Sequence, residues 1–326
     1  MNLPLKRRLL CAVACSATVL ALPSVAQPDP YPSKPITIVV AYPPGGSTDL
    51  TGRAVANALA KSLNATVVVE NVGGAGGAIG AQKVINAAPD GYTLLVGANN
   101  EIAISRLVSS NIKYHWQDFT PIGLIASQPL VLVAAPKMGV KSAEDFIKLT
   151  KAKPGQFSYG SSGVGTSLHL AGELIKEQAG IFMTHIPYRG VAPLTSDLIG
   201  NNIEFGVFVL SSGLPHIRSG KVIALGTTEK VRSKVTPDIP ALAEHPALKN
   251  TDIGTWFALM APGKLPDSIQ IRLRRALADA LQDPELRSRL EASGSTVVQG
   301  QTDMIKFLRD ETAKYQRVVD FAKIRE

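Results

Sequence analysis

Apolar and polar positions along most of the chain alternate between the spacing of buried strands and the spacing of helices. The run Ile36 to Tyr42 is continuously apolar and rich in β-branched residues, which is typical of a strand buried on both faces. After the break at Pro43 to Gly46, apolar residues recur at helical spacing from Asp49 to Leu63. The pattern then predicts a strand, a short helix and a strand at Thr66 to Glu70, Ala78 to Ala87 and Tyr92 to Val96. Strands that alternate with helices predict an α/β fold with parallel strands.

Two parts of this pattern occur twice. The segment Phe157 to Ser167 repeats the strand and Gly-rich loop, and it leads into a predicted helix from Leu168 to Gln178. The strand Leu130 to Pro136 resembles Trp256 to Pro262, and each precedes a polar turn and an amphipathic helix. Such repeats predict two similar α/β lobes.

The position of the second Ala-Pro strand predicts the domain boundaries. Because it comes late, we expect the chain to cross to the second lobe and to return, with two strands forming a hinge. Residues 27–127 and 251–326 are predicted to form lobe 1, and residues 128–250 lobe 2. The last helices, about Ser268 to Ala292 and Thr302 to Ile324, would pack on lobe 1.

Residues 1–26 have the pattern of a secretory signal peptide. Three basic residues at positions 6–8 precede an apolar run, Leu9 to Leu22, and the small-residue pattern Ser24-Val25-Ala26. The run is shorter than the ~20 residues of a membrane-spanning helix. We expect export and cleavage after Ala26. The Arg7-Arg8 pair leaves twin-arginine export open beside ordinary secretion, and Cys15 leaves a lipid anchor open.

Composition excludes several classes of function. Cys11 and Cys15 are the only two cysteines, so the mature chain is expected to have no disulfide and no thiolate nucleophile. Removing the three basic signal residues from the net charge of +8 leaves +5, with the remaining basic residues scattered among acids. Nucleic-acid binding needs a basic stripe or an aromatic platform, and neither occurs. The five histidines are dispersed, and we expect no metal and no cofactor.

The loop after the first strand is the first candidate binding site. Its glycines permit close approach of a ligand to the backbone, and Ser47 or Thr48 could cap the following helix. The first turn of a helix offers unpaired N–H donors and the positive end of the helix dipole, which suit a carboxylate. The alternative is a tight turn that binds nothing. The candidate ligand-binding residues here are Tyr42, Pro44, Gly45, Gly46, Ser47, Thr48 and Asp49.

A second loop offers the same features, so two helix N-termini could hold an anion from opposite sides. Its candidate residues are Ser161, Ser162, Gly163, Gly165, Thr166 and Ser167. Arg189 and Gly190 follow a predicted strand, Met183 to Tyr188, at the edge where α/β clefts open. There Arg189 could pair with a distal carboxylate or form a surface salt bridge. Phe208, Ala98 and Asn99 complete the candidate set.

Other motifs are weaker. The Gly-rich segment Gly73 to Gly80 has glycines spaced as G-x-G-x-x-x-G rather than as the dinucleotide fingerprint, which favours a close turn. No G-x-S-x-G nucleophile motif occurs, since Val164 stands where the last glycine should be. His169 has no acid partner at a recognisable spacing and is interpreted as a helix-packing residue. We therefore expect no catalytic residues, although a secreted hydrolase or cofactor enzyme on a similar scaffold is the alternative.

A series of short motifs extends along the whole mature chain. They are Tyr31-Pro32-Ser33-Lys34-Pro35-Ile36, Pro43-Pro44-Gly45-Gly46-Ser47-Thr48-Asp49, Val69-Glu70-Asn71, Gly74-Ala75-Gly76-Gly77, Pro89-Asp90-Gly91-Tyr92-Thr93-Leu94-Leu95, Gly160-Ser161-Ser162-Gly163, Ile186-Pro187-Tyr188-Arg189-Gly190 and Pro215-His216-Ile217. Together they resemble the Bug family, the substrate-binding receptors of tripartite tricarboxylate transporters. The resemblance implies a monomeric type II periplasmic binding protein with two Rossmann-like lobes. A carboxylate would be held in the cleft by the two Gly-rich loops. The implied partners are the large and small membrane subunits of such a transporter.

The chain also departs from the family pattern. The family usually has Lys where Arg189 stands and an acid near Phe208-Val209, and the missing acid argues against an amino-acid ligand. Asn99-Asn100-Glu101 replaces a small stretch that contains Ser, Thr or His. Aliphatic dicarboxylates, tricarboxylates and aromatic carboxylates all stay possible as ligands.

Overall fold

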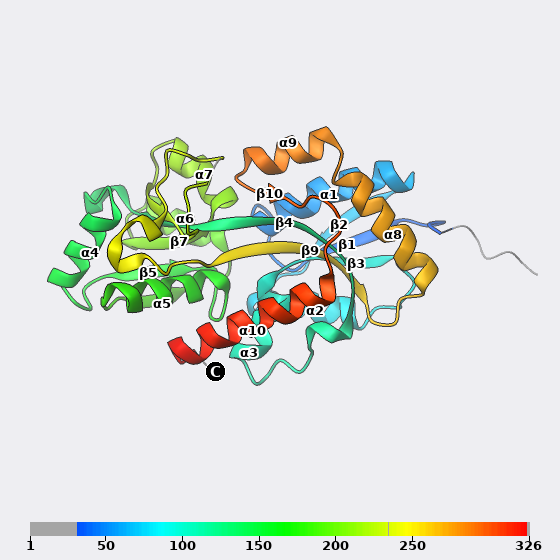
Figure 1. The fold of residues 1–326 in the computed structure, drawn as a ribbon, viewed down its shortest axis with the longest axis horizontal. Coiled ribbons are helices and arrows are strands. Elements are labelled where there is room, and N and C mark those ends of the chain that lie inside the picture. The colour runs from blue at the N-terminus through cyan, green and yellow to red at the C-terminus, as the bar shows by residue number, and fades with distance from the viewer. Residues whose placement is uncertain (1–30, 234, 325–326) are drawn as a thin grey trace, which may run out of the picture. The chain divides into compact units, whose positions relative to one another are not determined.

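The computed structural model describes residues 31–233 and 235–324. The predicted signal segment, its cleavage point and Cys15 lie outside these residues. The described part is a mixed α/β structure whose helices pack on a continuous sheet (Figure 1). No helix in it is long and apolar enough to cross a membrane.

The sheet contains ten strands, eight of them in the order β2-β1-β3-β9-β4-β7-β5-β6, with β8 and β10 also paired to β4. Their bounds are β1 Ile36–Val40, β2 Val67–Asn71, β3 Thr93–Ala98, β4 Phe119–Ala134, β5 Ser158–Ser161, β6 Thr184–Pro187, β7 Phe205–Val209, β8 Ile223–Thr227, β9 Gly254–Pro262 and β10 Thr296–Val297. The helices are α1 Ser47–Leu63, α2 Ala78–Ile85, α3 Ser105–Val108, α4 Ala143–Ala152, α5 Ser167–Ala179, α6 Val191–Ile199, α7 Leu210–Arg218, α8 Asp267–Ala280, α9 Pro284–Ala292 and α10 Met304–Ala322. A π-helical segment, η2 (Asn100–Ile104), follows β3 directly.

The predicted strand–loop–helix units form, and their strands are parallel. β1 pairs in parallel with β2 and β3, and β5 pairs in parallel with β6 and β7. α1 begins at Ser47, earlier than the predicted Asp49, because Gly46 rather than Ser47 or Thr48 is its N-cap. α5 ends at Gly180, whose φ of 61° is in the left-handed region that favours glycine.

Two long strands change the expected all-parallel arrangement. β4 and β9 pair with each other antiparallel, and β9 also pairs antiparallel with β3. β4 starts at Phe119, well before the predicted Leu130, and its register with β9 shifts between Pro121 and Gly123. Its last residues, Leu130 to Ala134, pair with β7 and β8 instead. The predicted strand Trp256–Pro262 therefore pairs with the first part of β4, before Leu130, and the two predicted Ala-Pro strands do not pair with each other, although β4 and β9 lie side by side (Figure 1).

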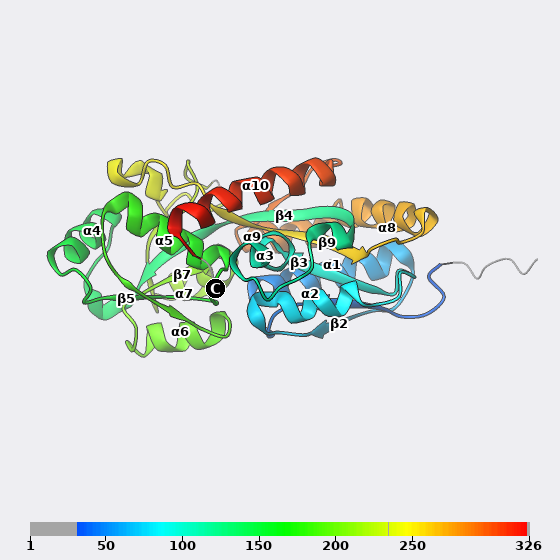
Figure 2. The same cartoon turned by 90° about the horizontal axis from the view of Figure 1, so that it is seen from below.

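The C-terminal helices differ from their prediction in two ways. The segment predicted as one helix is interrupted before Pro284, where the Asp283 side chain accepts hydrogen bonds from the first turn of α9. Proline is favoured at such a position because it has no N–H to leave unpaired. The last helix, α10, contacts η2 and α3, and it also packs against α5 (Figure 2).

Candidate functional site

The loop between β1 and α1 presents the first turn of a long helix without a cap. Gly45 has a φ of 89°, in the left-handed region, and Gly46 is the N-cap in an extended conformation. No side chain caps α1, and its first internal bond runs from the Leu50 N–H to the Gly46 carbonyl. The N–H groups of Ser47 and Thr48 therefore have no intrahelical partner.

Asp49 holds this loop in place rather than lining the cavity. Its buried carboxylate accepts hydrogen bonds from the Gly45 N–H at 3.0 Å, Arg53 Nε at 3.0 Å and Asn71 Nδ2 at 2.8 Å. Burial raises the pKa of Asp49, but hydrogen bonds from these three groups outweigh it and lower the pKa below its ordinary value. The Gly-rich turn is thus anchored by an ionised carboxylate.

A second uncapped helix end belongs to α6, not to α5. Gly190 is the N-cap of α6 with a φ of 114°, and no side chain caps the helix. Val191 and Ala192 supply N–H groups, whereas Pro193 has none to supply. This helix start faces the same cavity as the start of α1.

Two N–H groups in the first turn of α5 are already satisfied, contrary to the sequence prediction. The Thr166 side chain accepts from the His169 N–H at 3.4 Å. The Ser167 N–H donates to Asn100 Oδ1 at 2.7 Å. The expectation of free donors on the second loop is wrong for these two groups, because Asn100 comes from a distant segment and takes the place a ligand oxygen was predicted to fill.

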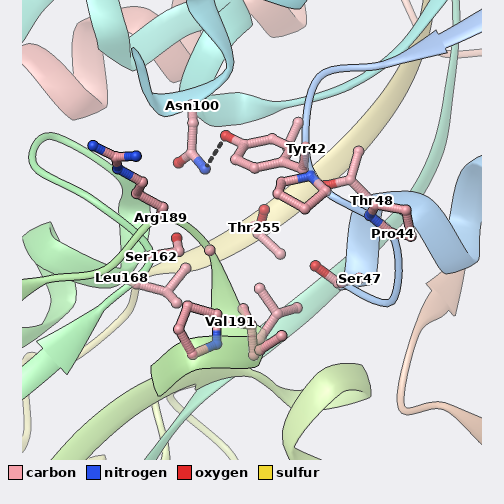
Figure 3. A pocket seen from close by; sticks show the side chains of 17 residues that line it. Tyr42, Pro44, Ser47, Thr48, Asn100, Ser162, Leu168, Arg189, Val191 and Thr255 are labelled. Atoms are coloured by element: carbon pink, nitrogen blue, oxygen red, sulfur yellow. Dashed lines mark hydrogen bonds between the residues drawn. The ribbon is translucent and has the colours of Figure 1, made fainter. Parts of the chain in front are cut away.

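Between α1 and α6 lies a cavity of about 50 Å³, which we call the anion cavity (Figure 3). Its lining consists of Tyr42, Pro43, Pro44, Gly46, Ser47, Thr48, Ala98, Asn100, Ser162, Leu168, Arg189, Gly190, Val191, Ala192, Pro193, Val209 and Thr255. No Asp or Glu is among these described lining residues.

The polar groups of the anion cavity are donors. The hydroxyls of Ser47, Thr48 and Ser162 have no hydrogen-bond partner among the described residues, and neither does the Arg189 guanidinium. A cavity with free hydroxyls, a guanidinium and two uncapped helix N-termini favours an anion over a cation.

The structure separates the sequence-predicted binding residues into three sets. Half of them line the anion cavity, namely Tyr42, Pro44, Gly46, Ser47, Thr48, Ala98, Ser162, Arg189 and Gly190. Gly163 lines an adjoining cavity. The others line neither cavity and are Gly45, Asp49, Asn99, Ser161, Gly165, Thr166, Ser167 and Phe208.

Two of the residues outside the lining have clear structural roles. The Phe208 side chain is fully buried in a hydrophobic cluster with Val131 and Leu210. Asn99 is fully buried, accepts from Thr255 Oγ1 at 2.7 Å and donates to the Tyr315 hydroxyl at 2.7 Å. Asn99 therefore connects the cavity residue Thr255 to α10.

Sequence reasoning missed eight lining residues, Pro43, Asn100, Leu168, Val191, Ala192, Pro193, Val209 and Thr255. Val191 to Pro193 could have been found, because a glycine followed by a proline three residues later is a helix-start signal, although no helix was predicted there. Thr255 and Val209 could not, since only the sheet pairing brings their strands to the cavity.

A buried hydrogen-bond network holds the Tyr42 hydroxyl in place. Because Asn100 Oδ1 accepts from Ser167, its Nδ2 is the atom that donates to the Tyr42 hydroxyl, at 2.9 Å. The same hydroxyl lies 2.9 Å from the Gly76 carbonyl and 3.0 Å from Glu101 Oε2. Tyr42 has a single hydroxyl proton for these two acceptors. When Glu101 is ionised, Tyr42 donates to Oε2 and not to the Gly76 carbonyl. A proton on Glu101 would let Glu101 donate to Tyr42 and leave the Tyr42 proton for the Gly76 carbonyl.

The electrostatics of Glu101 agree with this proton count. Burial raises the pKa of Glu101 to about 7, although hydrogen bonds from the Ala98 N–H, its own N–H and Tyr42 favour the anion. No ion pair of Glu101 occurs within residues 31–233 and 235–324. Glu101 is thus a largely desolvated carboxyl group next to a cavity residue.

The second loop contains a serine–histidine pair that the sequence motifs did not indicate. Ser161 Oγ lies 2.7 Å from His185 Nε2, and the His185 ring stacks on His169 at 3.8 Å. His169 Nε2 is also 3.8 Å from Glu173, so the expectation that His169 has no acid partner is wrong. Ser161 is fully buried, and burial lowers the pKa of His185 to about 3 and of His169 to about 4. The helix-packing interpretation of His169 fits this geometry, and a buried serine cannot reach a substrate.

Solved structures share this fold along nearly the whole described chain. The periplasmic binding protein BugD is 29% identical with a TM-score of 0.86, covering 90% of this chain and 99% of its own. The protein Rpa4515 of R. palustris, solved with adipate, has the same identity, TM-score and coverage. MatC (Rpa3494) from Rhodopseudomonas palustris, solved with bound malate, is 27% identical with a TM-score of 0.83, covering 89% and 100%. Fold and cavity together define a periplasmic-type solute-binding protein.

Family relationships narrow this class. A family model described as "Tripartite tricarboxylate transporter family receptor" matches residues 51–323. Protein BugT of Bordetella pertussis is 34% identical over 317 residues, covering 96% of each chain. The chain belongs to the tripartite tricarboxylate transporter receptor family, as the sequence motifs predicted. This is a family of solute-binding receptors and not of enzymes.

Proposed function

We propose that this chain is an exported receptor that captures a small organic carboxylate in the anion cavity. The observation that carries the proposal is the lining, which offers free donors on several sides and no acidic side chain among its described residues. The uncapped starts of α1 and α6 would hold the carboxylate through backbone N–H groups. Ser47, Thr48, Ser162 and Arg189 would add side-chain donors.

We further propose the lobe organisation predicted from the sequence, with residues 27–127 and 251–326 in lobe 1 and 128–250 in lobe 2. The division of β4 supports it, because its first part pairs with β9 and its end pairs with β7 and β8. In this division α10 belongs to lobe 1 and α5 to lobe 2, so their contact would connect the two lobes.

The family supports a cellular context as part of the proposal. The chain would be exported to the periplasm, cleaved after Ala26 and act as a monomer. It would deliver its ligand to the large and small membrane subunits of a tripartite tricarboxylate transporter. Adipate and malate, which occupy related structures, indicate the size of acid to test first.

Carboxylates are expected to raise the melting temperature of the mature protein, with a stabilisation that grows as ln(1 + [L]/Kd). Methyl esters of the same acids should stabilise it little, because helix N-termini and Arg189 favour negative charge. A thermal-shift screen of organic acids and their esters, followed by calorimetric titration, tests this. Equal stabilisation by acid and ester would contradict the proposed site.

Replacing Arg189 with alanine is expected to weaken dicarboxylate binding by about 1.5–3 kcal/mol, the range for a hydrogen bond to a charged group. A monocarboxylate of matched length should lose less. Arg189→Lys should recover only part of the loss, because a point charge does not reproduce a planar fork of donors. Titration calorimetry measures both effects. The control is Arg309→Ala, which changes an exposed residue of α10. If the Arg189→Ala protein binds both acids as tightly as the wild type, Arg189 does not contact the ligand and the Gly-rich loops form the whole binding site.

A further inference from the structure

A second and much larger cavity adjoins the anion cavity. Its volume is about 710 Å³, against about 50 Å³ for the anion cavity, and we call it the glycine-loop cavity. Both cavities are lined by Tyr42, Pro43, Ser162, Arg189 and Gly190. We propose that the ligand occupies both, with its carboxylate in the anion cavity and an aromatic body in the glycine-loop cavity. This inference rests on the proposed function and names the ligand class, an elongated aromatic carboxylate.

Size is the first argument. A water-sized group needs about 10–15 Å³ of such volume, so the anion cavity holds roughly three to five of them. That is room for a carboxylate and one or two carbon atoms. The buried side chains of Leu168, Val209 and Thr255 line the anion cavity and limit its depth. The rest of a larger acid therefore has space only past Arg189, in the glycine-loop cavity.

The lining of the glycine-loop cavity is the second argument. One wall is the backbone of Gly73 to Gly77, where the methyl group of Ala75 is the only side chain. The Gly76 carbonyl accepts from Tyr42, and the Gly77 N–H donates to the Gly74 carbonyl, so neither of these groups needs a ligand. A wall of peptide groups without projecting side chains offers a smooth surface to a flat ring.

The rest of the lining carries rings and a single cation. Pro43, Pro187 and Tyr188 belong to it, with Pro43 beside Gly73, and the Tyr188 hydroxyl donates to Asp197 Oδ2 at 2.7 Å. Arg189, on the border of the two cavities, has a planar guanidinium that stacks well on aromatic faces. No Asp or Glu is among the described lining residues, which disfavours a ligand body that carries a positive charge. A rigid ring also loses less conformational entropy on binding than a flexible chain.

Binding of acetate, adipate and 2-naphthoate to the mature protein tests the inference. Acetate occupies the anion cavity alone, and adipate and 2-naphthoate extend beyond it with an aliphatic or an aromatic body. We expect 2-naphthoate to bind at least tenfold more tightly than either acetate or adipate. Ala75→Trp should fill part of the glycine-loop cavity, remove most of this gain and leave acetate affinity unchanged. Ala75 already has a φ of 48°, so a larger unbranched residue adds little backbone strain.

The control is Ile271→Trp, which places the same ring on an exposed position of α8 outside both cavities. It should leave all three affinities unchanged, as measured by NMR titration, and melting temperatures verify that both variants fold. If 2-naphthoate gains nothing over acetate and adipate, or Ala75→Trp leaves the gain intact, the inference is overturned and the proposed function stands. If no organic acid binds at all, the proposed function itself fails.

Discussion

Replacing Glu101 with glutamine is expected to stabilise the folded protein relative to the wild type at high pH. The difference in unfolding free energy between the variant and the wild type should be about 3 kcal/mol larger at pH 9 than at pH 4. Glutamine keeps the shape of the protonated carboxyl group and cannot ionise. The pKa of Glu101 rises from an ordinary value of 4.5 to about 7 on burial, so the folded wild type holds a proton that the unfolded chain releases earlier.

The sign of this effect follows from that difference. The stability that the protonated Glu101 contributes is complete below pH 4.5 and is lost as the pH rises through about 7. Urea unfolding of both proteins at four pH values between 4 and 9 measures it. Glu70→Gln is the control, since it makes the same change at a side chain that is 46% exposed. A Glu101→Gln effect of constant size over the whole range would contradict a buried, proton-binding carboxyl group.

Replacing Asn100 with aspartate is expected to weaken carboxylate binding by about 100-fold at pH 8. Two like charges about 5 Å apart at an effective dielectric constant of about 20 repel by about 3 kcal/mol. Asn100 lies in the lining of the anion cavity, where its amide points toward Tyr42 (Figure 3). An aspartate there would face the ligand with a negative charge and could no longer donate to Tyr42.

The Asn100→Ala variant separates the effect of the added charge on binding from the effect of losing the amide. It removes the hydrogen bonds to Tyr42 and Ser167 but adds no charge, so it should weaken binding by no more than about tenfold. Titration calorimetry with adipate at pH 8 compares the two variants. Equal losses would mean that the charge does not face the ligand, and the anion would then bind elsewhere in the protein.

The sequence predicted those parts of the fold and site that depend on local order. Gly46-Ser47-Thr48 follows an apolar strand and precedes a helical pattern, so a helix N-terminus at the sheet edge follows from neighbouring residues alone. The second helix N-terminus was predicted on α5, whereas α6, which starts after Gly190, provides the second free end.

Features that depend on distant pairs could not be predicted. Nothing near Ser167 indicates that Asn100, from another part of the chain, satisfies its N–H. The early start of β4 could not be predicted because Pro121 and Pro129 lie in this segment, and proline rarely occurs in central strands. Glu101 was singled out as unusual, but only the burial of the segment after β3 shows that its pKa is raised.

The hydrogen bonds of Asn99 have a consequence for how the chain is made. Asn99 binds the Tyr315 hydroxyl and Thr255, and all three residues are buried. Synthesis proceeds from the N-terminus, so β1 to β3 emerge from the ribosome long before α10. Until Tyr315 is released, the base of the cavity lacks one of its partners, and an unpaired buried amide is costly. The receptor therefore cannot complete its binding site while it is still being translated, and a stop codon before Tyr315 would yield a chain that never completes it.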